Sequence, residues 1–135
     1  MPDITVQPFI LNDCLLTVGE DNYEAHVSKV QFDPTAPVVR WKGLTPASSH
    51  IFGGASEWTC GMDYAQDWTT PNSLSAYLHA NEGKPIDVVF KPLREGTPSI
   101  AATIIVAPGS IGGTVDQVAT ASITVASTKP VIDAA

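Results

Sequence analysis

The stretch Trp68–Lys91, WTTPNSLSAYLHANEGKPIDVVFK, is the most informative part of the sequence, because it holds the only expected helix and, directly after it, a strand. Thr70 suits a helix N-cap, and Pro71 suits the first helical position, where a missing N–H costs nothing. Gly83 readily takes the left-handed conformation that ends a helix, and Pro85 prevents continuation. We therefore expect a helix of about ten residues that ends before Gly83.

One apolar stripe runs along this expected helix. Leu74, Tyr77 and Leu78 lie at positions i, i+3 and i+4, which places them on the same side. So short a helix is marginal by itself and has to pack its stripe against other structure. The strand expected at 85–91 begins the sheet that would receive it. Leu74 and Leu78 are therefore expected to face a sheet.

The composition indicates a single, mainly β domain spanning residues 1–135. Hydrophobic residues make up 44% of the chain and charged residues only 16%. Val, Ile and Thr are frequent, and Pro or Gly interrupts them about every ten residues, which favours strands. Seven strands are expected, at residues 13–18, 23–33, 38–42, 57–63, 85–91, 99–107 and 117–127. The expected fold class is a β-sandwich or barrel of about seven strands with one short flanking α-helix.

Two local features are expected at the first strands. The tetrad Gly19–Asn22 is rich in turn residues and predicts a hairpin between strands 13–18 and 23–33. In the second of these strands the apolar side changes between Val27 and Val30. A β-bulge near Ser28–Lys29 would explain this change.

Three segments are expected to lie outside the strands: an extended arm at 1–12, a long loop at 43–56 and a loose tail at 129–135. The loop carries Ile51 and Phe52, followed by Gly53 and Gly54. Both apolar side chains either fold back into the domain as a satellite cluster or form an apolar tip for a partner. The second interpretation makes Ile51, Phe52, Gly53 and Gly54 candidate inter-subunit contacts.

The charge balance disfavours tight binding of nucleic acid. Fourteen acidic residues face seven basic ones, for a net charge of −7, so no basic patch is available to hold phosphates. The N-terminus lacks the positive region and apolar run of a secretory signal, and no run is long enough to span a membrane. Cys14 and Cys60 form no zinc-ligand spacing and are expected to be small buried thiols, with a structural disulfide as the alternative.

The search for catalytic motifs points away from an enzyme. His26, His50 and His79 show no paired spacing, and the Gly109–Gly113 segment lacks the lysine of a phosphate loop. Glu57, Asp63 and Asp67 lack the spacing of a calcium loop and are expected on a solvated face. We expect no catalytic residues, no cofactor and no metal. The serious alternatives are an assembly protein and a β-sandwich binding module, for which three aromatic residues are available: Trp41, Trp58 and Trp68.

The order of elements resembles a known family. The run SLSAYLHANEGKPIDVVFKP, followed by a strand pair bracketing PGSIGGTVDQVATASITV, is similar to major tail (tail tube) proteins of long-tailed bacteriophages, especially those of actinobacterial phages. The similarity spans roughly Phe32–Val125. Its pattern is an aromatic strand, a short helix ending in Asn-Glu-Gly, two strands, a Gly-Gly turn and a strand rich in Thr, Ser and Ala.

This resemblance implies a β-barrel or sandwich related in fold to the tube proteins of type VI secretion. It implies a structural virion protein that forms hexameric rings, which stack into a tube for genome delivery. Its partners would be further copies of itself and other tail proteins, namely the tape measure, terminator and distal tail proteins. DNA would pass through the lumen without adhesion, and no membrane would be bound. The protein would be made in the bacterial host cytoplasm and reside in the virion tail. A terminator or connector protein of the tail is the neighbouring alternative.

Overall fold

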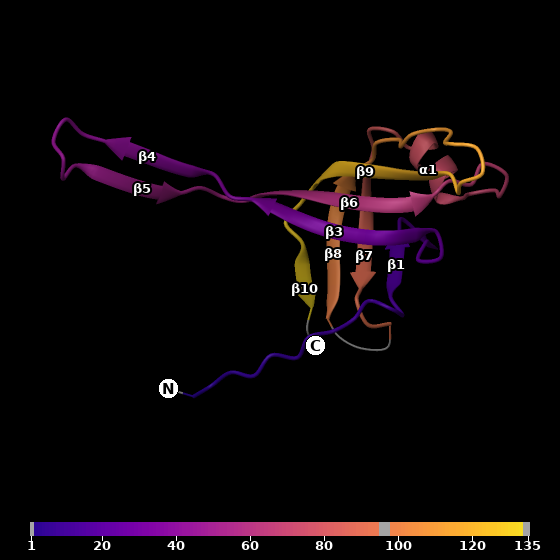
Figure 1. Cartoon of the computed structure of the whole chain (residues 1–135), viewed down its shortest axis with the longest axis horizontal. Helices are drawn as coiled ribbons and strands as arrows, with labels where there is room; N and C mark the ends of the chain where they lie inside the picture. Colours follow the sequence, from indigo (N-terminus) through magenta and orange to yellow (C-terminus); the bar gives the residue numbers. More distant parts are fainter. Residues whose placement is uncertain (1, 95–97, 134–135) are drawn as a thin grey trace.

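The computed structural model describes residues 2–94 and 98–133, and within them it contains ten strands and one helix (Figure 1). The strands are β1 (Leu15–Val18), β2 (Asp21–Asn22), β3 (Val27–Thr35), β4 (Val38–Lys42), β5 (Ser49–Gly53), β6 (Glu57–Ala65), β7 (Pro85–Lys91), β8 (Ser99–Ile105), β9 (Thr120–Ser127) and β10 (Val131–Asp133), and the helix is α1 (Leu74–Ala80). The mainly β class with one short flanking helix is confirmed.

Eight strands form one curled sheet in the order β2-β1-β7-β8-β9-β6-β3, with β10 paired to β8. The link between β8 and β9 is narrow, because it consists of the single pair Ile104 and Ser127. The sheet therefore divides into two layers, β1-β7-β8 and β9-β6-β3, whose strands cross in Figure 1. The sheet ends at β2 and β3, and among the described residues neither β1 nor β2 pairs with β3, so the barrel is open along that side.

The core lies between these layers and follows the period of two that strands impose. In β6 the buried positions alternate as Cys60, Met62 and Tyr64, and in β9 as Ala121, Ile123 and Val125. Trp58 lies on the same face of β6 as Cys60 and Met62 but is only half-buried. The intervening residues of both strands face away from the core, and they form a second surface described below.

The helix begins later than expected, at Leu74, and Ser73 is its N-cap. Thr70 and Pro71 instead open a turn in which Ser73 N–H donates to the Thr70 carbonyl, and Asn72 has a φ of 60°. Proline followed by a residue with positive φ is the pattern of a type II turn. The Ser73 hydroxyl accepts from Ala76 N–H at 3.4 Å, so the cap expected at Thr70 was placed three residues too early.

The apolar stripe of the helix is confirmed. Leu74 and Leu78 are completely buried in the core, and Gly83 has the expected left-handed φ of 79°. Tyr77 is half-buried and its ring lies 5.8 Å from that of Tyr23. Helix α1 thus contributes two leucines to the core between the layers.

The hairpin expected from the first two long strands is wrong beyond its turn. On the hairpin side, β1 pairs with the two residues of β2 and not with β3, which pairs with β6. Tyr23 explains the break, because its ring is buried and its hydroxyl donates to the Asn72 carbonyl, which draws the chain into the core. The expected bulge is confirmed, since the register of β3 shifts between Val27 and Lys29.

Two segments expected to be irregular contain strands. Within 43–56, residues 49–53 form β5, which pairs with β4 along its whole length. Within 129–135, residues 131–133 form β10, which pairs with β8, while 134–135 lie outside the described residues. Backbone pairing along the ladder holds both segments although their side chains are exposed. Of the arm expected at 1–12, residues 2–12 contain no helix or strand and are exposed.

Candidate assembly surfaces

The β4–β5 hairpin projects away from the barrel (Figure 1). It continues the β3–β6 pair, since the chain passes from β3 to β4 and from β5 to β6 through a few residues on each side. At its base the Gly54 N–H donates to the Pro37 carbonyl at 2.9 Å. A side chain at Gly54 would meet the Pro37 ring at 2.7 Å, so glycine is required for this close approach. Gly54 therefore closes the hairpin at its base.

Apolar side chains cover the hairpin without being buried. Five of them are more than half exposed, at 56–62%: Val38, Val39, Trp41, Ile51 and Phe52. Leu44, in the turn that joins the two strands, is fully exposed. An isolated two-stranded hairpin is marginally stable in water, and a cluster of exposed apolar residues marks a contact surface on most proteins. The hairpin is the first candidate assembly surface.

The two sides of the hairpin differ in chemistry. Val39 pairs with Phe52 and Trp41 with His50, so these four residues share one side. The His50 ring lies 5.9 Å from the Trp41 ring and 6.4 Å from the Phe52 ring. The other side carries Val38, Arg40 and Ile51, because Arg40 pairs with Ile51. We call these the aromatic side and the aliphatic side of the hairpin.

The four candidate contact residues therefore do not form one apolar tip. Ile51 and Phe52 point to opposite sides of β5, and Gly53 and Gly54 lie at its end near the base. The satellite-cluster interpretation is wrong, because Ile51 is 62% and Phe52 56% exposed. Val39, Trp41 and Leu44 belong to the same surface but were not expected there. Val39 and Trp41 lie in the expected strand 38–42, and nothing in its sequence indicated that both of its faces would be exposed.

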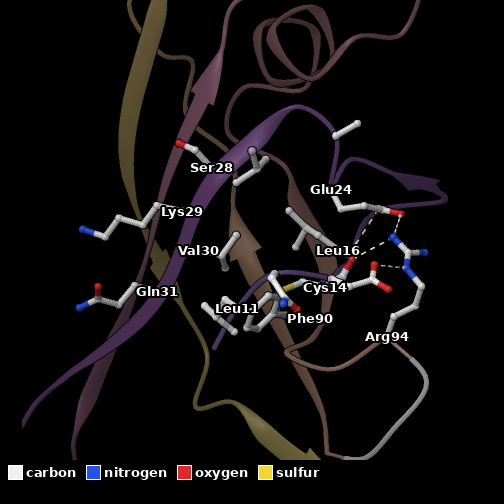
Figure 2. Close-up of a pocket in the computed structure, with 14 residues that line it drawn as sticks. Leu11, Cys14, Leu16, Glu24, Ser28, Lys29, Val30, Gln31, Phe90 and Arg94 are labelled. Atoms are coloured by element: carbon white, nitrogen blue, oxygen red, sulfur yellow. Dashed lines mark hydrogen bonds and ion pairs between the residues drawn. The ribbon is translucent and has the colours of Figure 1, made fainter. Parts of the chain in front are cut away.

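A groove of about 640 Å³ lies along the open side of the barrel, between β1 and β3 (Figure 2). One wall comes from Cys14, Leu16 and Phe90, and the other from Val27 and Val30 of β3. The side chains of Val30 and Phe90 point toward the same space in Figure 2, and Leu11 also lines the groove. The groove exists because no strand joins β1 to β3.

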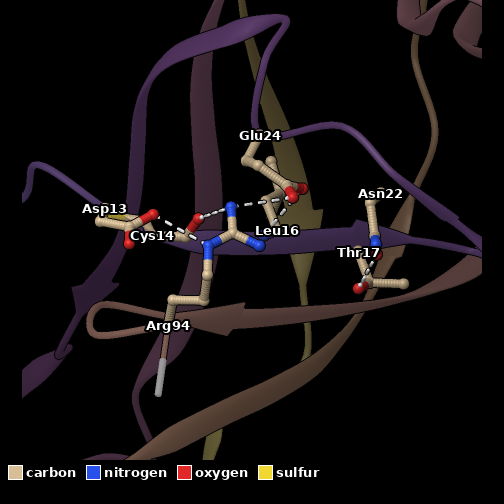
Figure 3. Close-up of polar contacts among 7 residues, drawn as sticks. All are labelled: Asp13, Cys14, Leu16, Thr17, Asn22, Glu24 and Arg94. Atoms are coloured by element: carbon tan, nitrogen blue, oxygen red, sulfur yellow. Dashed lines mark hydrogen bonds and ion pairs between the residues drawn. The ribbon is translucent and has the colours of Figure 1, made fainter. Parts of the chain in front are cut away.

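Arg94 holds the chain at the start of β1 (Figure 3). Its Nε donates to the Asp13 carboxylate at 2.8 Å, and one terminal nitrogen donates to the Cys14 carbonyl and to the Glu24 carboxylate at 3.0 and 3.1 Å. The Arg94 backbone N–H also donates to the Asp13 carbonyl. Burial alone would raise the pKa of Glu24, but hydrogen bonds and Arg94 lower it overall. These contacts join segments about 80 residues apart in the chain.

The outer side of the β3-β6-β9 layer consists mostly of small or uncharged side chains and carries little positive charge. Its rows run Lys29–Asp63–Ser122, Gln31–Gly61–Thr124 and Asp33–Thr59–Ala126 across the three strands. These are residues that point away from the core. Most are small or uncharged, and the charged ones are two aspartates and one lysine. This outer layer is the second candidate assembly surface, and it offers few positive charges to a polyanion.

The thiols differ in environment. Cys60 is fully buried in β6, and burial, with a contribution from Asp33, raises its pKa to about 12. Cys14 is only half-buried at the groove, which corrects the expectation that both thiols are buried. Both are free. Within the described residues, no group of three or more His, Cys, Asp or Glu side chains is placed to hold a metal ion.

The remaining polar candidates have structural roles. Asp67 accepts hydrogen bonds from the Thr69 and Thr70 backbone N–H groups at 3.0 and 3.1 Å, which fixes the turn before α1. Gln66 holds the glycine-rich segment, because its side chain bonds both backbone groups of Gly112 and the Thr120 carbonyl. The glycine-rich segment is thus tied to the end of β6 in the described structure.

The tryptophans do not form a shared platform. Trp41 lies on the hairpin beside His50, and Trp68 lies before α1 beside His79. Trp58 is half-buried at the start of β6, and its indole N–H is buried with no partner among the described residues. No ring contact in the described structure joins two tryptophans. No helix in the described part of the chain is long and apolar enough to cross a membrane.

The fold is shared with solved structures, although no family model and no curated protein matches this sequence significantly. One similar chain comes from a cryo-EM structure of an extracellular contractile injection system, the PVC sheath/tube terminator in the extended state. It has a TM-score of 0.66 and 14% identity over 97% of this chain and 100% of that chain. A second comes from the PVC sheath-tube complex in the extended state, with a TM-score of 0.66 and 13% identity over 95% of this chain and 93% of that one. The fold is therefore of the type found in such tube assemblies.

Proposed function

We propose that this chain is a structural subunit of a tail tube, which associates with copies of itself into rings that stack around a channel for genome delivery. The fold shared with chains of sheath-tube and tube-terminator assemblies supports this function. We expect hexameric rings, as the resemblance to phage tail tube proteins implies. The proposed site is the virion tail, after synthesis in the bacterial host cytoplasm.

The projecting hairpin carries this proposal. Its apolar side chains are more than half exposed in a single copy, although each would contribute roughly 1.5–3 kcal/mol if fully buried. A neighbouring copy that covers either side of the hairpin supplies this burial. In a ring the same contact repeats at every subunit, and linked contacts act together, so a modest gain per copy becomes decisive.

The outer layer suits the wall of the channel. A wall rich in small, uncharged and acidic residues offers DNA few phosphate contacts, and each such contact would strengthen binding and slow the passage of DNA. Lys29 is the basic residue in the three rows named above. We therefore assign the outer side of β3, β6 and β9 to the lumen, where DNA is present only in transit.

The other partners in this proposal are proteins of the tail: the tape measure, terminator and distal tail proteins. No cofactor, catalytic reaction or membrane enters the proposal. A role as tail terminator is the second candidate, because the match to a chain of the sheath/tube terminator structure has the same TM-score as the match to the sheath-tube complex. A terminator would form one ring and stop, whereas a tube subunit would continue to stack.

Negative-stain microscopy of the concentrated, purified protein separates these functions. Tubes of stacked rings are the expected result, and discrete single rings would favour the terminator. Uniform monomers at every concentration would contradict both. In that case binding to a sugar array would test the remaining alternative, a carbohydrate- or protein-binding module.

A further inference from the structure

The N-terminal arm, residues 2–12, is rich in large apolar side chains that are more than half exposed in a single copy. Its five large hydrophobic residues are 51–94% exposed: Ile4, Val6, Phe9, Ile10 and Leu11. The arm contains no helix or strand. In its first half Ile4 and Val6 alternate with Thr5 and Gln7, which is the pattern of a strand with one apolar face. The arm therefore has the composition of a strand that lacks its sheet.

The groove along the open side of the barrel lacks such a strand. β3 is the last strand of its layer and pairs only with β6 among the described residues, so its other edge offers unpaired backbone groups. Exposed edges of this kind are usually covered, because they otherwise pair with other chains. Beside this edge the groove is lined by half-buried Val30 and by the core residues Leu16 and Phe90. Main-chain pairing and apolar pockets together are the two requirements for strand addition.

Arg94 fixes the chain at the start of β1, where only Leu11 and Asn12 of the arm line the chain's own groove. The Arg94 backbone and side chain hold both the carbonyl and the carboxylate of Asp13, and also the Cys14 carbonyl. The chain is therefore fixed at the residues where the arm would have to reverse to reach β3. In Figure 1 the arm runs past the C-terminus and away from the barrel. A groove on another copy is accordingly the site that this direction makes available.

We propose that the arm of one copy lies along β3 in the groove of a neighbouring copy, as an additional strand between that copy's β1 and β3. Ile4 and Val6 face the groove and Thr5 and Gln7 face away. This inference rests on the proposed function, because it requires copies side by side.

The size of the contact assigns the arm an auxiliary role. Stable interfaces commonly use about 20–30 residues on each side, and the arm supplies eleven. It therefore acts together with the hairpin contacts and not as the basis of an isolated dimer. The exchange also closes the open side of every barrel in the ring.

A native thiol makes this placement testable in the full chain. Cys14 lies in the groove, while Cys60 is fully buried and does not compete. The Val6→Cys variant is oxidised with copper–phenanthroline at concentrations where the wild type assembles, and the products are separated under denaturing conditions. We expect disulfide-linked dimers and higher ladders that dithiothreitol removes. Adding Cys14→Ser should abolish them.

Two matched variants control for chance collision. Gln7→Cys places the thiol one residue away, on the opposite face of the added strand, and Val118→Cys places it on an exposed loop elsewhere. Both should form at least tenfold less linked product than Val6→Cys. Equal ladders from all three variants would contradict the proposal, because encounter alone would explain them.

The remaining outcomes separate this inference from the proposed function. A Val6–Cys14 link confined to single chains would place the arm in its own groove and overturn the exchange between copies. Absence of any link in a sample that forms tubes would overturn the arm placement and leave the tube function standing. Absence of both links and assemblies would contradict both proposals.

Discussion

Val39 lies directly opposite Phe52 in the β4–β5 hairpin, and more than half of each side chain is exposed. With Trp41 and His50 they form the aromatic side, whereas Val38 and Ile51 belong to the aliphatic side. The two sides can be tested separately. Val39→Ser with Phe52→Ser removes apolar area from the first, and Val38→Ser with Ile51→Ser removes it from the second.

We predict that these two double variants differ in assembly and not in folding. Exposed substitutions usually change stability by less than about 0.5 kcal/mol, so both should melt close to the wild type. The side that contacts a neighbour should be the one whose variant forms fewer rings in sedimentation velocity. Equal, undiminished assembly by both variants would exclude the hairpin as a contact surface.

Leu78→Ala should destabilise the subunit by about 2–5 kcal/mol, the usual range for a buried leucine. Leu78 is completely buried in the core, and its removal leaves a cavity between α1 and the sheet. Denaturant unfolding measures the change. His79→Ala is the matched control, because His79 is the exposed neighbour on the same helix. Equal stability of the two variants would show that α1 does not pack as described.

The two thiols should react at very different rates. Thiolates are the reactive species, and burial raises the pKa of Cys60 to about 12, so little thiolate forms at neutral pH. Cys14 is half-buried at the groove. Titration of dilute native protein with a thiol reagent should detect one fast thiol per chain, and a second only after unfolding. Fast reaction of both in the native protein would contradict the burial of Cys60, and Cys14→Ser identifies which thiol reacts.

Stability should decline as the pH falls below the ordinary range of carboxylic acids. Hydrogen bonds from the Thr70 side chain and from the backbone of Thr69 and Thr70 lower the pKa of Asp67 below its ordinary 3.8, and the pKa of Glu24 lies below its ordinary 4.5. A carboxyl with a lowered folded-state pKa stabilises the fold above its ordinary pKa, and this contribution is lost as the pH falls through the folded-state pKa.

Thermal melts between pH 7 and pH 2 measure this loss. Asp67→Asn and Glu24→Gln should each be less stable than the wild type at pH 7, and the difference should shrink toward pH 2. A difference that stays constant across the range would show that ionisation of these carboxyls does not contribute.

Much of the fold follows from local sequence signals. Val38–Lys42 and Pro85–Lys91 form strands with the expected bounds, because turn-forming residues flank them and alternation or β-branched residues fill them. The bulge near Ser28–Lys29 was visible as a change in which face is apolar. The late start of α1 was less visible, since Thr70-Pro71-Asn72 fits both a helix start and a turn.

The assembly surfaces were only partly predictable. Ile51 and Phe52 stood out as apolar residues in an apparent loop, but β5 was missed because exposed strands show no buried face and hence no alternation. Part of the groove's lining is formed where Arg94 meets Asp13 and Glu24 across 70–81 residues of chain. No local sequence pattern predicts such a contact. The pairing of β3 with β6 and not with β1 likewise depends on contacts between segments that are distant in the sequence.

In the proposed function, the exposed hairpin drives assembly of otherwise complete subunits. Sedimentation velocity over a concentration series, on the wild type and on Ile51→Ser with Phe52→Ser, together with a thermal melt of each, measures assembly and folding separately. We predict large assemblies for the wild type, and for the variant a folded monomer with an unchanged melting temperature. A variant that assembles like the wild type, or one that melts clearly earlier because these side chains stabilise the single subunit, would contradict the claim.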